Sequence, residues 1–332
     1  MRALPRSSKG GERISTLIEA RDLKKYFTIR GSKGGSRVLR AVDGVSLSIE
    51  NGETFGLVGE SGCGKTTLGR TMIRLYDVTG GTLKFDGTDI TKLTGKALAP
   101  YRQRMQIIFQ DPYSSLNPFM NVEELVSEPL DLREKLNKAD RRERVMQILK
   151  KVGMDESALE KYPHEFSGGQ RQRIGIARAL IVRPDFVLCD EPISALDVSI
   201  QAQVVNLLED LQAEMGLTYL FVAHDLSMVR HISRRIGVMY MGHMVEISPS
   251  KELYTNPLHP YTRALLSAIP IPDPRRAKEV KRIALSGDLP SPSQVATGCP
   301  FRTRCPHVMP KCSESAPELR EMSPGHQVAC FL

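Results

Sequence analysis

The 332-residue sequence contains no tryptophan, and aromatic residues make up only 6% of it. It also lacks any apolar run that approaches the ~20 residues a helix needs to cross a bilayer. The first fifteen residues, MRALPRSSKGGERIS, are basic but lack the apolar stretch of a secretory signal. These absences exclude a helical integral membrane protein and a leader-bearing secreted protein. We therefore expect the chain to stay in the cytosol unless a partner carries it to a membrane.

The net charge of +8 is concentrated in the first 40 residues, which contain eleven Lys or Arg and three Asp or Glu. The other 292 residues contain 35 of each sign. A basic arm could contact nucleic acid or anionic lipid, and the alternative is a solvated tail. Because no nucleic-acid motif or groove of basic and aromatic residues accompanies the arm, we favour the solvated tail and expect no nucleic-acid partner.

The pattern along the chain predicts an α/β protein with an extension at its C-terminus. Residues 1–13 are polar and rich in Gly and Lys, so we expect them to be disordered. Short β-branched segments follow, then a charged helical stretch at about 112–170. Beyond it, helices alternate with strands that are apolar on both faces, which is typical of a parallel sheet covered by helices. After residue 248 prolines become frequent and cysteines appear, so we predict a main domain at 14–248 and an extension at 249–332.

The strongest motif is GESGCGKTT, which fits the phosphate-binding pattern G-x-x-x-x-G-K-[ST]. An apolar strand pattern precedes it and a helical pattern follows, so backbone N–H groups can close around phosphate oxygens at a helix N-terminus. Lys65 is expected to reach the β- and γ-phosphates, and the Thr66 hydroxyl to hold Mg²⁺. Cys63 is interpreted as a small filler, because no base is assigned to it. The predicted ATP ligands of this loop are Gly59, Glu60, Ser61, Gly62, Cys63, Gly64, Lys65, Thr66 and Thr67.

A second motif, DFVLCDEP, places two carboxylates directly after a predicted buried strand. In enzymes with a phosphate-binding loop, an acid at the end of such a strand holds Mg²⁺, and Asp190 has that position. A second carboxylate beside it can polarise the attacking water as a general base, which is the role expected of Glu191. These two residues and the phosphate-binding loop together predict a site for nucleotide hydrolysis.

The stretch FSGGQRQRIGIARAL decides the family. Ser167 is placed to cap a helix, and Gly168 and Gly169 allow its first N–H groups to approach an anion. The stretch resembles LSGGQ, the signature of the ABC ATPase family, with Phe166 in place of Leu. The resemblance implies a P-loop NTPase (RecA-like) core with an antiparallel β subdomain and an α-helical subdomain. It also implies a dimer, because in that family the signature of one subunit, here Ser167 to Gln170, covers the ATP bound by another.

The other motifs of that family follow in order. Gln110 in IIFQDP is similar to the Q-loop glutamine, a catalytic residue and Mg²⁺ ligand that senses the γ-phosphate and couples to membrane subunits. Asp197 in SALD resembles the D-loop aspartate. His224 in LFVAHD resembles the catalytic switch histidine, and it lies at the end of a strand, where open α/β sheets bind ligands. Tyr26 in LKKYF is placed like the aromatic residue that stacks on adenine, with Phe27 as its competitor.

The segments NPLHPYTRALLSAIPIPDP and GCPFRTRCP are similar to the C-terminal extension of oligopeptide and dipeptide importer ATPases. His259, Pro260 and Tyr261 match the His-Pro-Tyr element of that extension, and the chain looks most like the F-type ATPase of dipeptide importers. The resemblance implies a peripheral ATPase subunit on the cytoplasmic side of the cell membrane. Its partners would be a paralogous ATPase subunit or a second copy of itself, two membrane permease subunits and, indirectly, an extracellular substrate-binding protein.

Two alternatives to peptide import remain at this point. The same ATPase role could serve another cargo, such as nickel, glutathione or an oligosaccharide, because the ATPase does not touch cargo. A soluble ABC ATPase that acts on ribosomes or DNA is the other alternative, and the basic N-terminal arm is its only support.

Four of the six cysteines, Cys299, Cys305, Cys312 and Cys330, lie in the last 34 residues. In a reducing cytosol such a cluster suggests a metal site rather than disulfides. The spacing lacks both the close Cys pairs of zinc sites and the ferredoxin pattern, so it leaves a cluster, zinc and free thiols open. A bound metal could organise this Pro-rich tail, which has little apolar area. Relatives with this tail are associated with a [4Fe–4S] cluster, so the resemblance favours that cluster, in a structural role, over Zn²⁺.

Overall fold

The computed structural model describes residues 15–30, 36–131, 136–269, 283, 285 and 297–332. The tail expected to be disordered at 1–13 lies outside these residues. Within them, no helix combines the length and the apolarity that a bilayer span requires.

In the part of the chain that the structure describes, the main sheet has eight strands in the order β11-β12-β10-β9-β3-β8-β7-β6. Strands β9, β3, β8 and β7 and the edge strand β6 run parallel, which confirms the parallel sheet expected from the apolar runs. Strands β3, β7 and β8 are buried at every position. The bounds of the parallel strands are Thr54–Val58 (β3), Met105–Ile108 (β6), Phe186–Asp190 (β7), Thr218–Val222 (β8) and Arg235–Tyr240 (β9).

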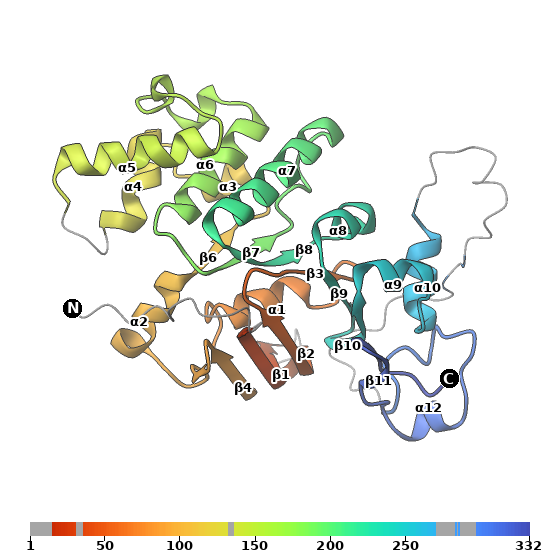
Figure 1. Cartoon of the computed structure of the whole chain (residues 1–332). Helices are drawn as coiled ribbons and strands as arrows, with labels where there is room; N and C mark the ends of the chain where they lie inside the picture. Colours follow the sequence, from red (N-terminus) through yellow and green to blue (C-terminus); the bar gives the residue numbers. More distant parts are fainter. Residues whose placement is uncertain (1–14, 31–35, 132–135, 270–282, 284, 286–296) are drawn as a thin grey trace, which may run out of the picture.

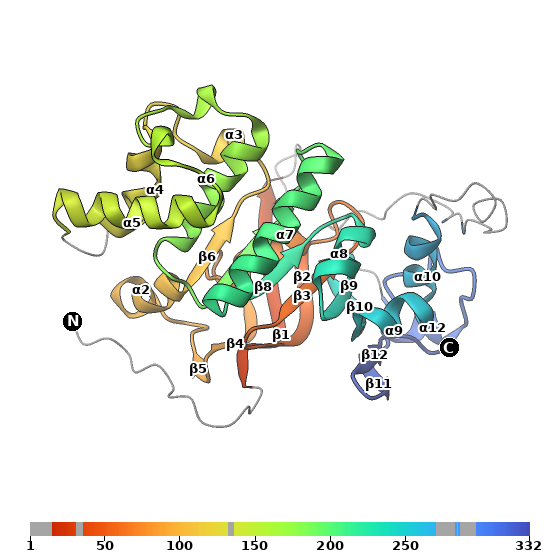
Figure 2. The ribbon, with the colours of Figure 1, turned by 45° about the horizontal axis from the view of Figure 1, so that its top comes forward.

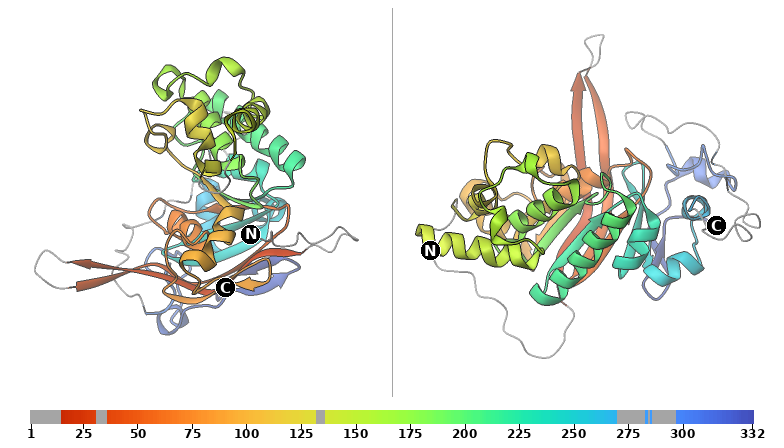
Figure 3. Two further views of the ribbon diagram at one scale, coloured as in Figure 1. Left: turned by 90° about the vertical axis from the view of Figure 1, so that its left-hand side faces the viewer. Right: turned by 90° about the horizontal axis from the view of Figure 1, so that it is seen from above.

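A second, antiparallel sheet has the order β2-β1-β4-β5. The hairpin of β1 and β2 projects far from the body of the molecule (Figure 3). Strands β4 and β5 pair through Phe85 and Thr88, and the Asp-Gly turn in GTLKFDGTDI connects them as a hairpin. The bounds are Thr16–Arg30 (β1), Ser36–Glu50 (β2), Gly80–Phe85 (β4) and Thr88–Asp89 (β5).

Helices surround the main sheet, and a helical lobe formed by α3, α4, α5 and α6 lies beyond its β6 edge (Figures 1 and 2). Two short 3₁₀ helices, Glu156–Ala158 and Pro163–Glu165, connect α5 to α6. The helices before and within the lobe are Lys65–Met72 (α1), Gly95–Arg104 (α2), Pro112–Ser115 (α3), Val122–Asp131 (α4), Lys138–Lys151 (α5) and Gly168–Leu180 (α6). The later helices are Val198–Met215 (α7), Leu226–Ile232 (α8), Ser250–Thr255 (α9), Pro260–Ser267 (α10) and Lys311–Glu314 (α12).

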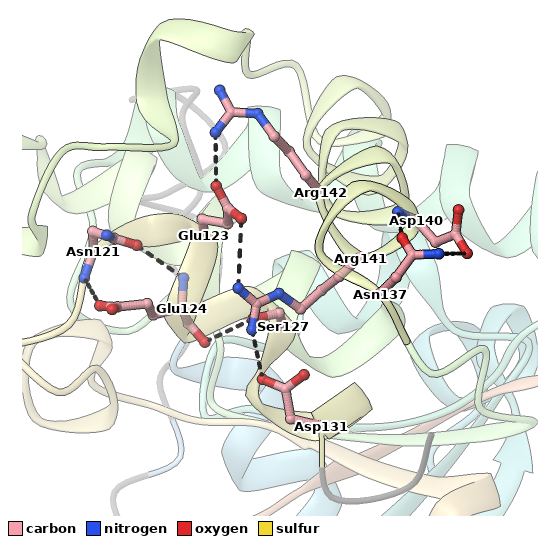
Figure 4. Close-up of polar contacts among 9 residues, drawn as sticks. All are labelled: Asn121, Glu123, Glu124, Ser127, Asp131, Asn137, Asp140, Arg141 and Arg142. Atoms are coloured by element: carbon pink, nitrogen blue, oxygen red, sulfur yellow. Dashed lines mark hydrogen bonds and ion pairs between the residues drawn. The ribbon is translucent and has the colours of Figure 1, made fainter. Parts of the chain in front are cut away.

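Polar contacts fix α4 against α5 in the lobe (Figure 4). The largely buried Glu123 carboxylate accepts a 2.8 Å hydrogen bond from Arg142 and lies 3.8 Å from Arg141. Asn121 and Glu124 exchange side-chain-to-backbone hydrogen bonds of 3.0 and 2.9 Å, the reciprocal arrangement of a capping box. The charged residues of this stretch therefore stabilise a specific helix pair and do not simply face solvent.

The C-terminal extension continues the main sheet at the end opposite the helical lobe (Figure 1). Strand β10, His243–Pro249, pairs antiparallel with β9 and also with β12, His326–Val328, which in turn pairs with β11, Arg320–Ser323. The extension is therefore connected to the main domain by backbone hydrogen bonds as well as by the chain. The domain boundary at residues 248 and 249 falls at the end of β10 and remains a prediction.

Candidate functional site

Strand β3 leads into the phosphate-binding loop, and α1 begins directly after it. Gly59, Gly62 and Gly64 have φ angles of 154°, 76° and 107°, in the region that favours glycine. A Cβ at Gly59 would lie 2.2 Å from the Met239 carbonyl oxygen. A Cβ at Gly64 would lie 2.1 Å from the Ala41 carbonyl oxygen. The loop conformation therefore requires glycine at both positions, and it leaves the N-terminus of α1 free to meet an anion.

The Lys65 side chain is buried inside this loop. Its Nζ donates hydrogen bonds to the carbonyl oxygens of Gly59 and Glu60, at 2.8 and 3.2 Å. These carbonyl contacts hold the ammonium beside the α1 N-terminus, where a phosphate group can replace them. Burial raises the pKa of the Cys63 thiol, so this cysteine is neutral and unreactive, in keeping with its interpretation as a filler.

The Thr66 hydroxyl donates a 2.8 Å hydrogen bond to Asp190 Oδ1, at the end of β7. Asp190 is fully buried, and its other carboxylate oxygen lies 3.1 Å from Nη2 of Arg70 on α1. A buried carboxylate is tolerated only with such partners. A hydroxyl and a carboxylate side by side are oxygen ligands of the kind that Mg²⁺ prefers. Arg70 lies outside every sequence motif described above, and it holds this carboxylate in place.

Glu191, Gln110 and His224 come together although they lie on separate loops. The Gln110 amide Nε2 donates a 2.9 Å hydrogen bond to Glu191 Oε2, and His224 Nδ1 lies 3.6 Å from the same oxygen. Glu191 has φ of 49°, a left-handed conformation that is strained for a non-glycine residue and is most often retained at functional sites. Its backbone N–H donates to the Val222 carbonyl, which fixes the carboxylate beside the end of β8.

One cleft of about 310 Å³ lies between the phosphate-binding loop and the Gln110–Glu191 pair, whereas Asp190 and His224 do not line it. Residues that the sequence analysis did not identify form part of its wall: Leu39, Arg40, Ala41, Met241 and Gly242. The predicted residues that line it are Ser61, Gly62, Cys63, Gly64, Lys65, Thr66, Thr67, Gln110 and Glu191. Most of the predicted phosphate-binding loop and two of the predicted catalytic residues therefore share one space.

Tyr26 lies behind Arg40 rather than in the wall of this cleft. Its hydroxyl donates a hydrogen bond to Asp43, and the Arg40 guanidinium lies 5.4 Å from the centre of its ring. Burial and the neighbouring Asp43 raise the pKa of Tyr26 to about 12. The competing Phe27 packs edge-on against Tyr76, with ring centres 5.5 Å apart. Of the two aromatic candidates, Tyr26 is the one in contact with a cleft residue, and its adenine-stacking role remains a prediction.

The signature residues lie on the helical lobe and do not line the cleft. Ser167 and Gln170 form a capping box at the start of α6, with reciprocal hydrogen bonds of 3.0 and 3.4 Å. A Cβ at Gly169 would lie 2.7 Å from a methyl carbon of Ile200, so glycine is required where α7 approaches. Asp197, before α7, is exposed and makes no capping hydrogen bond. These groups remain available to a nucleotide bound by another subunit.

The four cysteines of the extension line one small cavity of about 10 Å³. All four are free thiols, and burial raises the pKa of both Cys299 and Cys305. A volume of that size is about what one water molecule needs. In the part of the chain that the structure describes, no three His, Cys, Asp or Glu residues are arranged to hold a metal ion. The four thiols therefore lie around one cavity, which a shared metal site would require. Their positions do not match those of metal ligands, so the predicted [4Fe–4S] cluster gains no support from them.

Sequence comparison matches residues 42–194 to the family described as "ABC transporter" and residues 245–312 to "Oligopeptide/dipeptide transporter, C-terminal region". The chain is 56% identical over 317 residues to the putative oligopeptide transport ATP-binding protein YkfD of Bacillus subtilis, covering 95% of both chains. It is 53% identical to AppF of Bacillus subtilis, over 96% of this chain and 97% of AppF. It is 51% identical to OppF of Salmonella typhimurium, over the same shares. AppF and OppF are both named as oligopeptide transport ATP-binding proteins.

Solved structures of ATP-binding cassettes share the fold. The dimeric post-hydrolysis state of the cassette MJ0796, bound to ADP and Pi, matches with a TM-score of 0.64 and 29% identity. That match covers 70% of this chain and 99% of MJ0796. CbiO1 of Clostridium perfringens, part of the transporter complex cbiONQ, matches with a TM-score of 0.64 and 28% identity, over 73% of this chain and 91% of cbiO1. The expected P-loop NTPase fold is thereby confirmed.

Proposed function

This chain belongs to the ATP-binding subunits of ABC transporters, in the oligopeptide and dipeptide transporter branch, and we propose that it hydrolyses ATP to drive peptide import. The observation that carries the proposal is that Lys65, Thr66 and the Gln110–Glu191 pair line one cleft. Thr66 is hydrogen-bonded to Asp190, the other proposed Mg²⁺ ligand at this point. The match of residues 245–312 to the transporter C-terminal region supports peptide as the cargo. The names of YkfD, AppF and OppF support oligopeptides in particular.

The roles of the site residues follow from their chemistry. The loop N–H groups and Lys65 would bind the β- and γ-phosphates, and Thr66, Asp190 and Gln110 would hold Mg²⁺. Glu191 accepts a proton from the attacking water as the general base. His224 Nδ1 lies 3.6 Å from this carboxylate, so the histidine would contact the γ-phosphate end of the bound ATP. Mg²⁺ supplies charge neutralisation between the β- and γ-phosphates when it is bound.

A second ATPase subunit completes the site. We propose that its signature residues, equivalent to Ser167 through Gln170, and its D-loop aspartate, equivalent to Asp197, cover the ATP held in this cleft. The exposure of Asp197 and the separation of the signature from the cleft of the same chain support this arrangement. The partner is a paralogous subunit or a second copy of this chain.

We propose that two membrane permease subunits dock where the helical lobe meets the β6 edge, which places the chain peripherally on the cytoplasmic side of the membrane. A cleft of about 340 Å³ lies there, and Phe109 of the Q-loop segment, Glu128 of α4 and Arg178 of α6 contribute to its wall. Nearby Phe119 is 87% exposed and Tyr113 is 64% exposed. Because Gln110 follows Phe109 directly, movement of a permease segment in this cleft would be transmitted to Gln110 at the nucleotide site. An extracellular binding protein would deliver the peptide.

We also propose that Cys299, Cys305, Cys312 and Cys330 form one metal site with a structural role. A [4Fe–4S] cluster is the favoured occupant and Zn²⁺ is the alternative. Convergence of the four thiols on one cavity supports a shared site, and the thiols would have to shift and deprotonate to become ligands.

Complementation tests the proposed function in cells. A strain that lacks the chain should fail to grow when a required amino acid is supplied only as a peptide, and the intact chain should restore growth. Restoration by the Glu191→Gln variant, at the same expression level, would contradict the ATPase role.

A further inference from the structure

Glu60, the second residue of the phosphate-binding loop, is held by two residues of the C-terminal extension. Its carboxylate accepts hydrogen bonds of 2.7 and 3.1 Å from the Arg304 guanidinium, 244 residues further along the chain. Its backbone N–H donates a 2.8 Å hydrogen bond to the Tyr261 hydroxyl. Its backbone carbonyl accepts the 3.2 Å hydrogen bond from Lys65. One residue therefore connects the extension to the lysine that faces the phosphates.

These contacts are shielded from solvent. The Arg304 side chain is 8% exposed, the Glu60 side chain is 22% exposed, and Tyr261 is fully buried. Two parallel N–H···O bonds between a guanidinium and a carboxylate fix the orientation of both groups. Because water screens this pair little, it constrains the loop more strongly than an exposed ion pair would.

The extension residues that reach Glu60 are anchored to the main sheet. Phe301 packs against Tyr240, at the end of β9, and against Tyr261, with ring centres 5.2 and 5.4 Å apart. His259 Nδ1 accepts a 3.0 Å hydrogen bond from the Tyr261 N–H and so caps α10. The His259 backbone N–H donates to the buried carboxylate of Glu246 on β10. Arg304 and Tyr261 therefore belong to a segment that is packed and hydrogen-bonded against the main sheet.

We propose that the C-terminal extension is part of the nucleotide site, with Arg304 and Tyr261 as positioning residues that hold Glu60 and its loop in the ATP-binding conformation. Lys65 must exchange loop carbonyls for phosphate oxygens when ATP binds. A loop held at Glu60 keeps its N–H groups oriented during that exchange. Less conformational entropy is then lost when ATP binds, so the affinity is higher. This inference rests on the proposed ATP-binding function.

ATP affinity of the full-length chain tests the inference. Arg304→Ala should weaken MgATP binding about tenfold, the scale of losing one charge-assisted hydrogen-bonded pair. In the assembled transporter KM for ATP should rise by about the same factor, whereas kcat should change less than about twofold, since Glu191 is untouched. Arg304→Lys keeps one charged contact and should give an intermediate affinity. Arg263→Ala is the matched control, because Arg263 is an exposed arginine of the same extension whose side chain donates to the Pro257 carbonyl and, among the described residues, makes no hydrogen bond to Glu60.

A double-mutant cycle separates positioning from general stability. Glu60→Ala and Arg304→Ala should have non-additive effects on ATP affinity, because each removes the same pair. If Arg304→Ala lowers Tm but leaves ATP affinity and KM at wild-type values, Arg304 is only a structural brace and the inference is wrong. If the wild-type chain does not bind ATP and Lys65→Ala changes nothing, the proposed function itself fails, which is a different result.

Discussion

Gln110 donates a hydrogen bond to Glu191, with 2.9 Å between the amide Nε2 and the carboxylate Oε2. The pair joins the residue that follows Phe109, which lines the proposed permease cleft, to the proposed general base. If Gln110 were to bind Mg²⁺ and the γ-phosphate as proposed, this hydrogen bond would break and Glu191 Oε2 would be free to accept a proton. Under the proposed function, this hydrogen bond would make the state of the general base depend on nucleotide binding.

Glu191→Gln should retain ATP binding and lose turnover by about 10²-fold or more, the scale of a lost general base. The amide is nearly the same size as the carboxylate but cannot take the proton, so ATP-bound dimer should accumulate. Phosphate release measures the turnover, and size-exclusion chromatography with ATP measures the dimer. Near-normal turnover in the assembled transporter would remove Glu191 from this role.

Lys65→Ala should weaken ATP binding by about 10- to 100-fold, because it removes charged hydrogen bonds to the phosphates. The fold should be retained, because the loop keeps its backbone contacts and the side-chain hydrogen bonds of Glu60 and Thr66. Calorimetric titration with MgATP checks the affinity, and circular dichroism checks the fold. Lys92→Ala, at an exposed lysine outside the cleft, is the control. Unchanged affinity in Lys65→Ala would refute the assignment of the phosphate-binding loop.

The lowered pKa of His259 predicts that the folded chain loses stability as the pH falls below about 6.5. Burial, with a smaller contribution from Arg263, lowers its pKa from 6.5 to about 4. The unfolded chain therefore binds a proton near pH 6.5 that the folded chain does not bind until about pH 4. The stabilisation by neutral His259 is complete above pH 6.5 and is lost as the pH falls from 6.5 towards 4.

His259→Asn should make stability less dependent on pH in that window. The asparagine oxygen can still accept the Tyr261 N–H, but the side chain does not titrate. Denaturant unfolding of both proteins at pH 7.0, 5.5 and 4.5 measures the difference, which is at most about 3 kcal/mol across the window. Identical pH slopes in the two proteins would contradict a buried, neutral His259.

Anaerobically purified protein should contain about four irons and four acid-labile sulfides per chain, the content of a four-cysteine cubane. Cys305→Ser should lose most of this iron, whereas Cys189→Ala, at a buried cysteine of β7, should keep it. Elemental analysis measures iron and zinc together. Colourless protein with one zinc per chain, or a Cys305→Ser variant with full iron, would disprove the cluster.

Local patterns predicted much of the site because its parts are locally encoded. The apolar run ending at Asp190 predicted β7, and the glycines of the phosphate-binding loop predicted a turn that does require glycine at Gly59 and Gly64. Ser167 was expected to cap a helix, and it does so with Gln170. Each of these features depends on residues within a few positions of one another.

Contacts between distant segments could not be predicted in the same way. Arg40 comes from the second sheet and Met241 from the end of β9, and both line the cleft. No local sequence pattern predicts that these two segments lie beside the phosphate-binding loop. The Arg304–Glu60 pair joins residues 244 positions apart. The change of composition after residue 248 predicts an extension, but it does not record that β12 of the extension pairs with β10 of the main sheet.

Peptide uptake by reconstituted vesicles tests the central claim most directly. This chain, its ATPase partner, both permeases and the binding protein would be reconstituted with ATP on the cytoplasmic face and a labelled oligopeptide outside. We expect uptake that requires ATP and falls to background when the chain carries Glu191→Gln. Uptake at the wild-type rate with that variant, or no peptide uptake although the complex hydrolyses ATP, would contradict the account.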